Sequence, residues 1–181
     1  MLRKILASLL AVLTLAACGG TETSTAMSGA PAAAEPAGPA RIVSISTVAT
    51  EMLFAIGAGD KVVAVDSLST FPVEAPVTDL SGFEPNVEAI LGFRPDLVVL
   101  SYDPGDVVAG LKAAGVATLL QGAAYTLADT YDQITALGAI TGDVDEAAVL
   151  VADMQSEMAD LAASVQERDE PLSYYLSLIH I

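Results

Sequence analysis

The side chains best suited to contact a ligand follow apolar segments of the sequence, and they carry hydroxyl, aromatic or carboxyl groups. They are Ser46, Thr47, Ser67, Phe71, Phe83, Tyr102 and Asp103. Hydroxyls can hydrogen-bond the polar rim of a ligand, and aromatic rings offer a flat apolar surface for a large planar molecule. These residues therefore predict non-covalent binding. Two structural roles stay open as well: Ser46 or Thr47 can cap a helix, and the aromatic rings can pack their loops onto the protein.

Residues that usually carry covalent, redox or metal chemistry are scarce in this sequence. Cys18 is the only cysteine and His180 is the only histidine. One residue of each kind cannot form a dithiol or a histidine cluster for zinc or manganese. His180 lies in the final residues, beyond the expected lobe, so we expect no histidine-dependent triad. Asp143, Asp145 and Glu146 lie where a helix is expected to begin, which explains their charge. We therefore expect no catalytic residue and no metal ligand.

Short apolar segments alternate with amphipathic ones from residue 41 onward. The apolar segments predict strands at residues 42–45, 62–65, 97–100 and 116–120. The amphipathic segments predict helices at residues 47–56, 87–91, 105–114 and 126–139, and a long polar loop is expected between residues 66 and 86. This alternation is typical of βα units and predicts an α/β lobe with a mainly parallel sheet over residues 41–142. The loops at the carboxyl ends of such strands share one edge of the sheet, which gathers the ligand-contacting residues.

One long helix is expected over residues 143–168. Asp143 with Glu146 three residues later predicts a capping box, and neither Pro nor Gly follows before Pro171. At 1.5 Å per residue such a helix spans about 36 Å, more than one small sheet requires. It is therefore expected to connect two lobes. Residues 169–181 would begin a second lobe that is missing from the chain, and the ending at residues 177–181 is not typical of a native strand.

The first 40 residues are expected to lie outside the folded lobe. Arg3 and Lys4 precede an apolar run too short to span a bilayer, which predicts an export signal over residues 1–17. The run ends in Leu15-Ala16-Ala17-Cys18, similar to a bacterial lipobox, and this similarity implies a diacylglycerol on Cys18. The composition of residues 18–40 predicts a disordered tether. We expect an exported chain, in the periplasm or at the outer face of the cell membrane, held to the membrane by its lipid alone.

Charge restricts the partners of the chain. It has 7 Lys and Arg against 23 Asp and Glu, a net charge of −16, which becomes −18 if Arg3 and Lys4 leave with the signal. Such a surface repels nucleic acid and anionic lipid. The basic residues of the expected lobe lie before strands or within helices, away from the ligand-contacting loops; they are Arg41, Lys61, Arg94 and Lys112. We expect a monomer whose lobe offers no cationic clamp to an anionic ligand.

Residues from Arg41 to about Pro171 resemble the periplasmic binding proteins that deliver cobalamin, haem and iron-siderophores to ABC importers. The matching blocks occur in the order and at the spacing of that family. They are residues 41–65, Phe71-Pro72, Gly82-Phe83, Asn86-Val87-Glu88-Ala89-Ile90 and Arg94-Pro95-Asp96-Leu97-Val98-Val99. The resemblance implies a class III solute-binding protein with two α/β lobes, in which a Rossmann-like N-terminal lobe is joined to the second by one rigid helix.

The resemblance also implies a ligand, partners and one docking residue. The ligand would be a small metal chelate, such as a ferric siderophore, cobalamin or haem, carried as cargo and not as a cofactor. The partners would be a permease dimer and cytoplasmic ATPases. Glu88 matches the family's Asn-x-Glu motif, whose acidic side chain meets an arginine of the permease, although a first-turn glutamate also favours the helix dipole.

Two other functions stay open. A surface lipoprotein could present its ligand to a sensor or partner without transport. An enzyme similar to a chelatase can be built on the same lobe architecture, but it would need a histidine or acidic cluster in the cleft.

Overall fold

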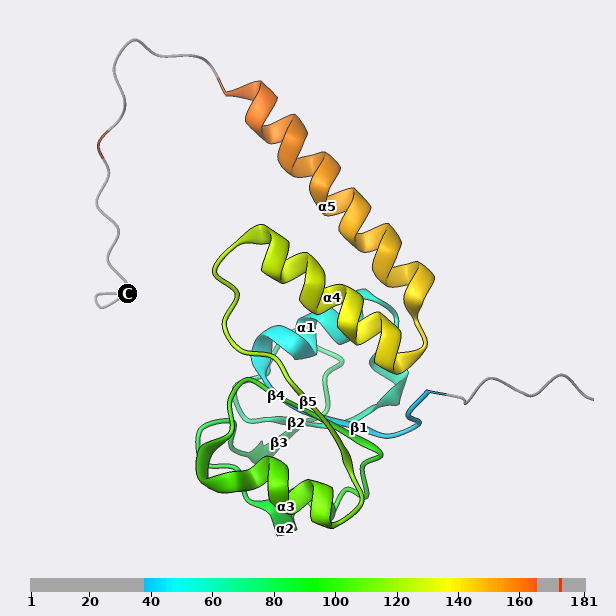
Figure 1. Ribbon diagram of the computed structural model, residues 1–181, viewed down its shortest axis with the longest axis vertical. Coiled ribbons are helices and arrows are strands. Elements are labelled where there is room, and N and C mark those ends of the chain that lie inside the picture. Colours follow the sequence, from blue (N-terminus) through cyan, green and yellow to red (C-terminus); the bar gives the residue numbers. More distant parts are fainter. Residues whose placement is uncertain (1–37, 166–172, 174–181) are drawn as a thin grey trace, which may run out of the picture. The chain divides into compact units, whose positions relative to one another are not determined.

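The centre of the fold is a five-stranded parallel sheet (Figure 1). The computed structural model describes residues 38–165 and residue 173. The strands are β1 Ile42–Ile45, β2 Val62–Asp66, β3 Val77–Leu80, β4 Leu97–Leu100 and β5 Ala117–Leu120. They lie in the order β3-β2-β1-β4-β5, and every neighbouring pair is parallel. The predicted α/β lobe with a parallel sheet is confirmed.

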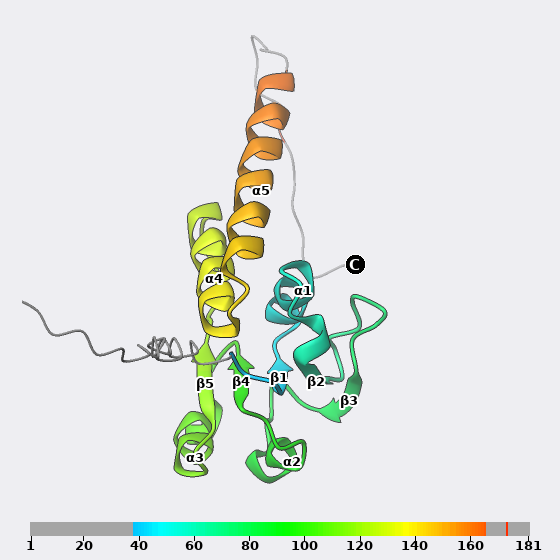
Figure 2. The same cartoon turned by 90° about the vertical axis from the view of Figure 1, so that its right-hand side faces the viewer.

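Helices cover both faces of this sheet, as the edge-on view in Figure 2 shows. They are α1 Thr47–Ala55, α2 Val87–Leu91, α3 Val107–Ala113, α4 Leu127–Thr141 and α5 Val144–Ser164, with short 3-10 turns at Gly59–Lys61 and Pro104–Asp106. Successive residues of β1 enter opposite layers: Ile42 packs with α1 and α4, and Val43 packs with α2 and α3. Because both layers are filled, β1 and β4 are buried along their whole length.

The segment between β2 and α2 contains a strand that its sequence does not reveal. β3 pairs with β2 alone, in the register Val65 with Val77 and Asp66 with Leu80, and only Leu80 of its four residues is buried. An edge strand needs few apolar residues, so Val-Thr-Asp-Leu has the composition of a polar loop. The expectation of one long loop between residues 66 and 86 was wrong.

Side-chain caps explain why three of the predicted helices begin where they do. The Ser46 hydroxyl accepts from the Ala49 N–H at 3.3 Å, and the Asn86 side-chain oxygen accepts from the Ala89 N–H at 3.0 Å. Thr126 and Asp129 form a full capping box at the start of α4. The helix expected from residue 105 begins two residues later, because Gly105 and Asp106 take positive φ values of 64° and 60°.

The start of α5 is held by an ion pair with a distant residue. The Lys61 Nζ lies 2.7 Å from Asp143 Oδ2 and also donates to the Thr141 carbonyl oxygen at 2.9 Å. Asp143 makes no side-chain cap, so the predicted capping box with Glu146 was wrong. Gly142 ends α4 with a φ of 87°, a conformation that glycine adopts without strain, and the chain turns there into α5.

α5 packs on α4 through its first half only. Ala147 is buried beside Gly138, and Leu150, Val151 and Met154 pack against the same apolar cluster. Residues 155–165 are all exposed. The helix ends at Ser164, earlier than expected, because Val165 already has extended backbone.

Several predictions made from the sequence fall outside the described residues. They concern the export signal 1–17, Cys18, residues 18–37 of the tether, residues 166–168 of the long helix, and most of residues 169–181. Within residues 38–165, none of the helices combines the length and the apolar character that crossing a bilayer requires.

Gly138→Ala is expected to destabilise the fold. A Cβ at Gly138 would lie 2.4 Å from the Ala147 Cβ and 2.8 Å from the Asp143 carbonyl oxygen. This overlap should outweigh the higher helix propensity of alanine and lower the free energy of unfolding by about 1–3 kcal/mol, measured in urea. Asp132→Ala, on the exposed side of α4, is the control and should change it by less than about 0.7 kcal/mol. Equal stability of Gly138→Ala and the parent would contradict this close packing of α4 and α5.

The ion pair between Lys61 and Asp143 should make stability depend on pH. Burial raises the pKa of Asp143, but hydrogen bonds from Lys61 and Thr141 and the Lys61 charge outweigh it, so the pKa lies below its ordinary value. A carboxyl with a lowered folded pKa stabilises the fold above its unfolded pKa of about 3.9, and this stabilisation is lost as pH falls through the folded value. Lys61→Met should therefore lower stability at pH 7 and flatten its fall below about pH 4.

The measurement is urea unfolding at several pH values from 7 down to 3. Lys112→Met, which removes an exposed lysine of α3, serves as the control and should keep the parental pH dependence. A Lys61→Met curve parallel to the parental curve over the whole range would show that the ion pair contributes nothing to it.

Candidate functional site

The centre of the candidate site is the point where the strand order reverses, between β1 and β4. Open parallel sheets bind ligands in the crevice that forms there, at the carboxyl ends of the strands. Ser46 follows β1 and Ser101 follows β4. The Ser101 hydroxyl donates to the Ser46 hydroxyl over 2.7 Å, so the two loops are joined across the reversal.

A pocket of about 190 Å³ opens beside this hydroxyl pair, and we call it the switch-point pocket. Four of the predicted ligand-contacting residues line it: Ser46, Thr47, Phe83 and Tyr102. The loops after β1, β3 and β4 supply Ser46, Phe83 and Tyr102, and Thr47 is the first residue of α1. The rule that placed these loops on one edge of a parallel sheet therefore brings these four residues together.

Phe83 and Tyr102 form an aromatic pair at this pocket. Their ring centroids are 6.5 Å apart with a tilt of 48°, and the Tyr102 hydroxyl donates to the Phe83 carbonyl oxygen at 2.5 Å. The exposed fractions are 67% for Phe83 and 41% for Tyr102. The hydrogen bond holds Tyr102 beside Phe83 while much of their apolar surface still faces outward. Such a surface is suited to stacking against a planar ligand.

A buried network behind the pocket fixes the loop after β2. Asp66 is 2% exposed; its Oδ1 accepts from the Leu68 and Ser69 N–H groups at 2.8 and 3.1 Å, and its Oδ2 accepts from the Ser69 hydroxyl at 3.1 Å. The Thr50 hydroxyl lies 3.3 Å from the Ser69 hydroxyl and 2.9 Å from the Ser44 hydroxyl. The network thus links the loop to β1 and α1. Asp66 is the last residue of β2, and Ser46 directly follows β1. The rule that ligand-contacting residues lie at the carboxyl ends of strands could therefore have identified Asp66 from the sequence as well.

The remaining predicted residues lie elsewhere. Ser67 is exposed and does not line the pocket. Phe71, 66% exposed, lies in a separate shallow depression with Glu51 and Phe54. The Asp103 carboxylate accepts from the Val108 N–H at 2.9 Å, at the beginning of α3. The roles predicted for these residues from the sequence remain predictions.

Glu88 lies in the first turn of α2 and is exposed. It belongs to the helical layer formed by α2 and α3, and neither its side chain nor this helix lines the switch-point pocket. The docking role predicted for Glu88 from the sequence remains a prediction.

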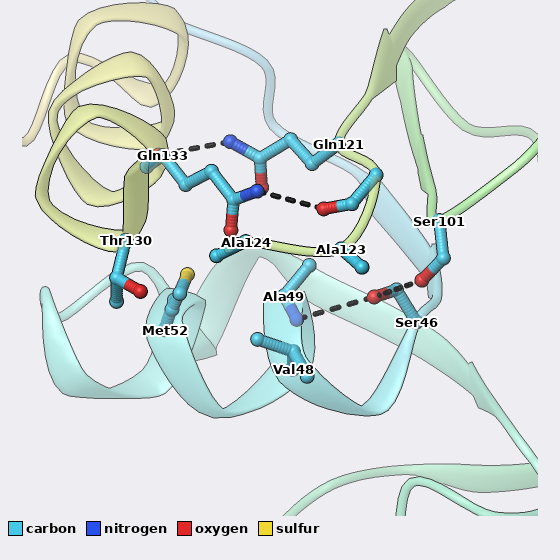
Figure 3. A pocket seen from close by; sticks show the side chains of 11 residues that line it. Ser46, Val48, Ala49, Met52, Ser101, Gln121, Ala123, Ala124, Thr130 and Gln133 are labelled. Carbon is cyan, nitrogen blue, oxygen red and sulfur yellow. Dashed lines mark hydrogen bonds between the residues drawn. The ribbon is translucent and has the colours of Figure 1, made fainter. Parts of the chain in front are cut away.

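A second pocket of about 400 Å³ lies between α1 and α4, and we call it the α1–α4 pocket (Figure 3). It shares Ser46 and Ser101 with the switch-point pocket, so the two are neighbours. Its other polar groups include the carboxamides of Gln121 and Gln133. Gln121 directly follows β5, and its position after a strand was the signal that could have identified it. Gln133 lies within α4, where no simple rule marks it.

Neither pocket is lined by a basic residue. Within residues 38–165, no group of three or more His, Cys, Asp or Glu side chains is arranged to hold a metal ion. Hydroxyls, carboxamides and apolar side chains line the α1–α4 pocket, and hydroxyls, aromatic rings and the internally hydrogen-bonded Asp66 carboxylate line the switch-point pocket. This chemistry suits a largely neutral organic ligand whose binding needs no charge pairing.

Comparison with known proteins supports the resemblance seen in the sequence. The model of the family described as "Periplasmic binding protein" matches residues 42–179. The ABC transporter substrate-binding lipoprotein YvrC of Bacillus subtilis is 31% identical over 147 residues, covering 77% of this chain and 47% of its own. The cobalamin-binding protein of Halobacterium salinarum is 31% identical over 144 residues, covering 76% of this chain and 39% of its own.

A solved structure shows the same fold. The periplasmic heme binding protein HutB of Vibrio cholerae superposes with a TM-score of 0.65 and 26% identity, over 71% of this chain and 51% of its own. The chain spans about half or less of the length of the curated relatives described above. The family match extends from the first strand beyond the end of α5, and so the chain belongs to the periplasmic binding protein family.

Proposed function

We propose that the chain forms the N-terminal binding lobe of an extracytoplasmic protein that captures a metal chelate for an ABC importer. The observation that carries the proposal is the switch-point pocket, with its hydroxyl pair and its exposed aromatic pair at the carboxyl edge of the sheet. Relatives named for cobalamin and heme binding support the ligand class.

The lobe would act by binding and not by catalysis, and the chelate would be its cargo. Cobalamin, haem and ferric siderophores all present broad surfaces against which Phe83 and Tyr102 could pack. Because no basic residue lines the pockets, a neutral chelate suits this lobe better than a strongly anionic one.

The location and partners follow from the same proposal. Export and a lipid on Cys18 would hold the monomeric lobe at the outer face of the membrane or in the periplasm, where it meets incoming chelate. Exposed Glu88 would contact an arginine of a permease dimer that is coupled to cytoplasmic ATPases.

Removal of the aromatic surface should weaken chelate binding. Phe83→Ala and Tyr102→Ala are each expected to raise the Kd about 2- to 10-fold, because each removes a stacking partner worth about 0.5–1.5 kcal/mol. Because the chain would supply one of two lobes, binding would be measured on the protein with both lobes present, by calorimetry against cyanocobalamin, haemin and a ferric hydroxamate siderophore. Tyr125→Ala is the control, since Tyr125 is 92% exposed and lines neither pocket.

Two results would argue against this site. If none of the three chelates bound saturably to the protein with both lobes present, the proposed ligand class would be wrong. If Tyr125→Ala weakened binding as much as the two pocket variants did, the aromatic pair would have no particular role.

Glu88→Gln should separate docking from folding. Loss of the charge from the first turn of α2 costs the helix only about 0.3–1 kcal/mol, whereas loss of one partner of an interfacial ion pair costs about 2–5 kcal/mol. Affinity for the reconstituted importer should therefore fall about tenfold or more, measured by surface binding or stimulated ATP hydrolysis. Glu84→Gln, another exposed glutamate, is the matched control. Unchanged affinity in Glu88→Gln would favour a lipoprotein that presents its ligand without this contact.

A further inference from the structure

We propose that the α1–α4 pocket is a subsite for a neutral carboxamide group carried by the ligand, with Gln121 and Gln133 as its recognition residues. The inference rests on the proposed function, because it concerns one arm of a ligand whose body would occupy the switch-point pocket. It adds a selection rule: this lobe distinguishes chelates by whether their arms end in amides or in carboxylates.

The α1–α4 pocket adjoins the switch-point pocket, so one ligand could extend from one into the other. Ser46 and Ser101 line both, and their hydroxyls are hydrogen-bonded at 2.7 Å. Figure 3 shows the two carboxamides above Met52 and Ala49 of α1, with the Ser46–Ser101 pair at the opposite end of the pocket. A volume of about 400 Å³ accommodates a short side arm of a bound molecule.

The orientation of both carboxamides is fixed by backbone contacts. Gln121 Nε2 donates to the Gln133 carbonyl oxygen at 2.9 Å, and Gln133 Nε2 donates to the Gly122 carbonyl oxygen at 2.7 Å. Exchange of the oxygen and nitrogen of either amide would bring two acceptors together, so these contacts assign the atoms. The amino groups therefore bind the backbone, and the side-chain oxygens remain as acceptors.

The main evidence for a ligand at this pocket is the side-chain oxygen of Gln121, Oε1. It is enclosed and accepts no hydrogen bond from the residues that the structure describes. An enclosed acceptor without a donor is unfavourable, and a donor brought by a ligand would satisfy it. Figure 3 shows the half-buried Gln133 carboxamide beside that of Gln121, so both line the place that a ligand donor would enter.

The chemistry of the walls selects the ligand group. A carboxylate would meet carbonyl oxygens and no Lys or Arg, so it would lose its hydration without a charged partner. An ammonium group would meet no Asp or Glu among walls that are otherwise largely apolar, including Val48, Ala49 and Met52. A neutral carboxamide can donate its N–H to Gln121 Oε1 without bringing a charge among these walls. Corrins with amide arms fit this rule, and porphyrins with propionate arms do not.

The first test uses two small probes that differ in this group alone. The ¹⁵N-labelled chain would be titrated with propionamide and with sodium propionate, and the side-chain NH₂ resonances of Gln121 and Gln133 followed by NMR. Propionamide should shift both saturably, and propionate should bind at least about tenfold more weakly. An equal response to the two probes, or no saturable response to propionamide, would overturn the proposal.

Variants of the two glutamines test whether the response to propionamide arises in the α1–α4 pocket. Gln121→Met and Gln133→Met remove the amides while keeping side chains of similar length, and each should abolish the saturable response at the remaining glutamine. Gln155→Met makes the same change on the exposed part of α5 and should leave the response intact. If Gln121→Met failed to fold, Gln133→Met alone would decide, and full retention of propionamide binding in it would overturn the proposal.

Chelate binding separates this inference from the proposed function. Cyanocobalamin should bind more tightly than a derivative in which amide arms are hydrolysed to carboxylates, and Gln121→Met should reduce the difference. If no chelate binds even to the protein with both lobes present but the propionamide shifts persist, the proposed function fails and the amide subsite stands. If chelates bind without regard to amide or carboxylate arms, the subsite fails and the proposed function stands.

Discussion

The parallel pairing of β1 with β4 is the constraint on which the rest of this structure depends. Four residues of each strand pair in register, from Ile42 with Leu97 to Ile45 with Leu100. Because both strands are buried on both faces, a slip of their register would misplace apolar side chains in both layers at once. The register therefore fixes where the two strands end, and with them the relative position of Ser46 and Ser101.

The hydroxyl pair stands between two unlike surfaces. On one side the switch-point pocket has exposed aromatic rings beside buried Asp66, whose carboxylate accepts hydrogen bonds from the loop after β2. On the other side the α1–α4 pocket has fixed carboxamides between apolar helices. A ligand with a broad apolar body and short polar arms would match both surfaces together. The absence of basic residues from both linings agrees with the strongly acidic composition of the chain.

Burial explains which parts of the fold could be predicted from the sequence. β1 and β4 are apolar runs because both of their faces are covered, and the capped helices carry their start signals locally. β3 could not be predicted because its edge position leaves a polar composition. Asp143 looked like a capping residue from its neighbours, but its partner Lys61 is 82 residues away in the sequence and only the fold brings them together.

The candidate site divides in the same way. Ser46, Thr47, Phe83 and Tyr102 follow strands, and a positional rule gathers them. Gln133, Thr50 and Ser69 also build the site, but their place depends on helix rotation and on the path of one loop, which a single sequence does not specify. Phe71 shares the aromatic character of Phe83 yet lies outside the switch-point pocket, because the loop after β2 passes along α1.

Hydrogen exchange with and without cyanocobalamin would test most directly whether the carboxyl edge between β1 and β4 is the ligand face. Addition of the chelate should slow exchange of backbone amides in residues 67–69, 82–84, 101–103 and 122–125, which lie at that edge. Residues 57–61, 92–94 and 114–115, at the opposite edge, should be unaffected. Protection confined to the opposite edge, or to α2 and α3, would contradict the account.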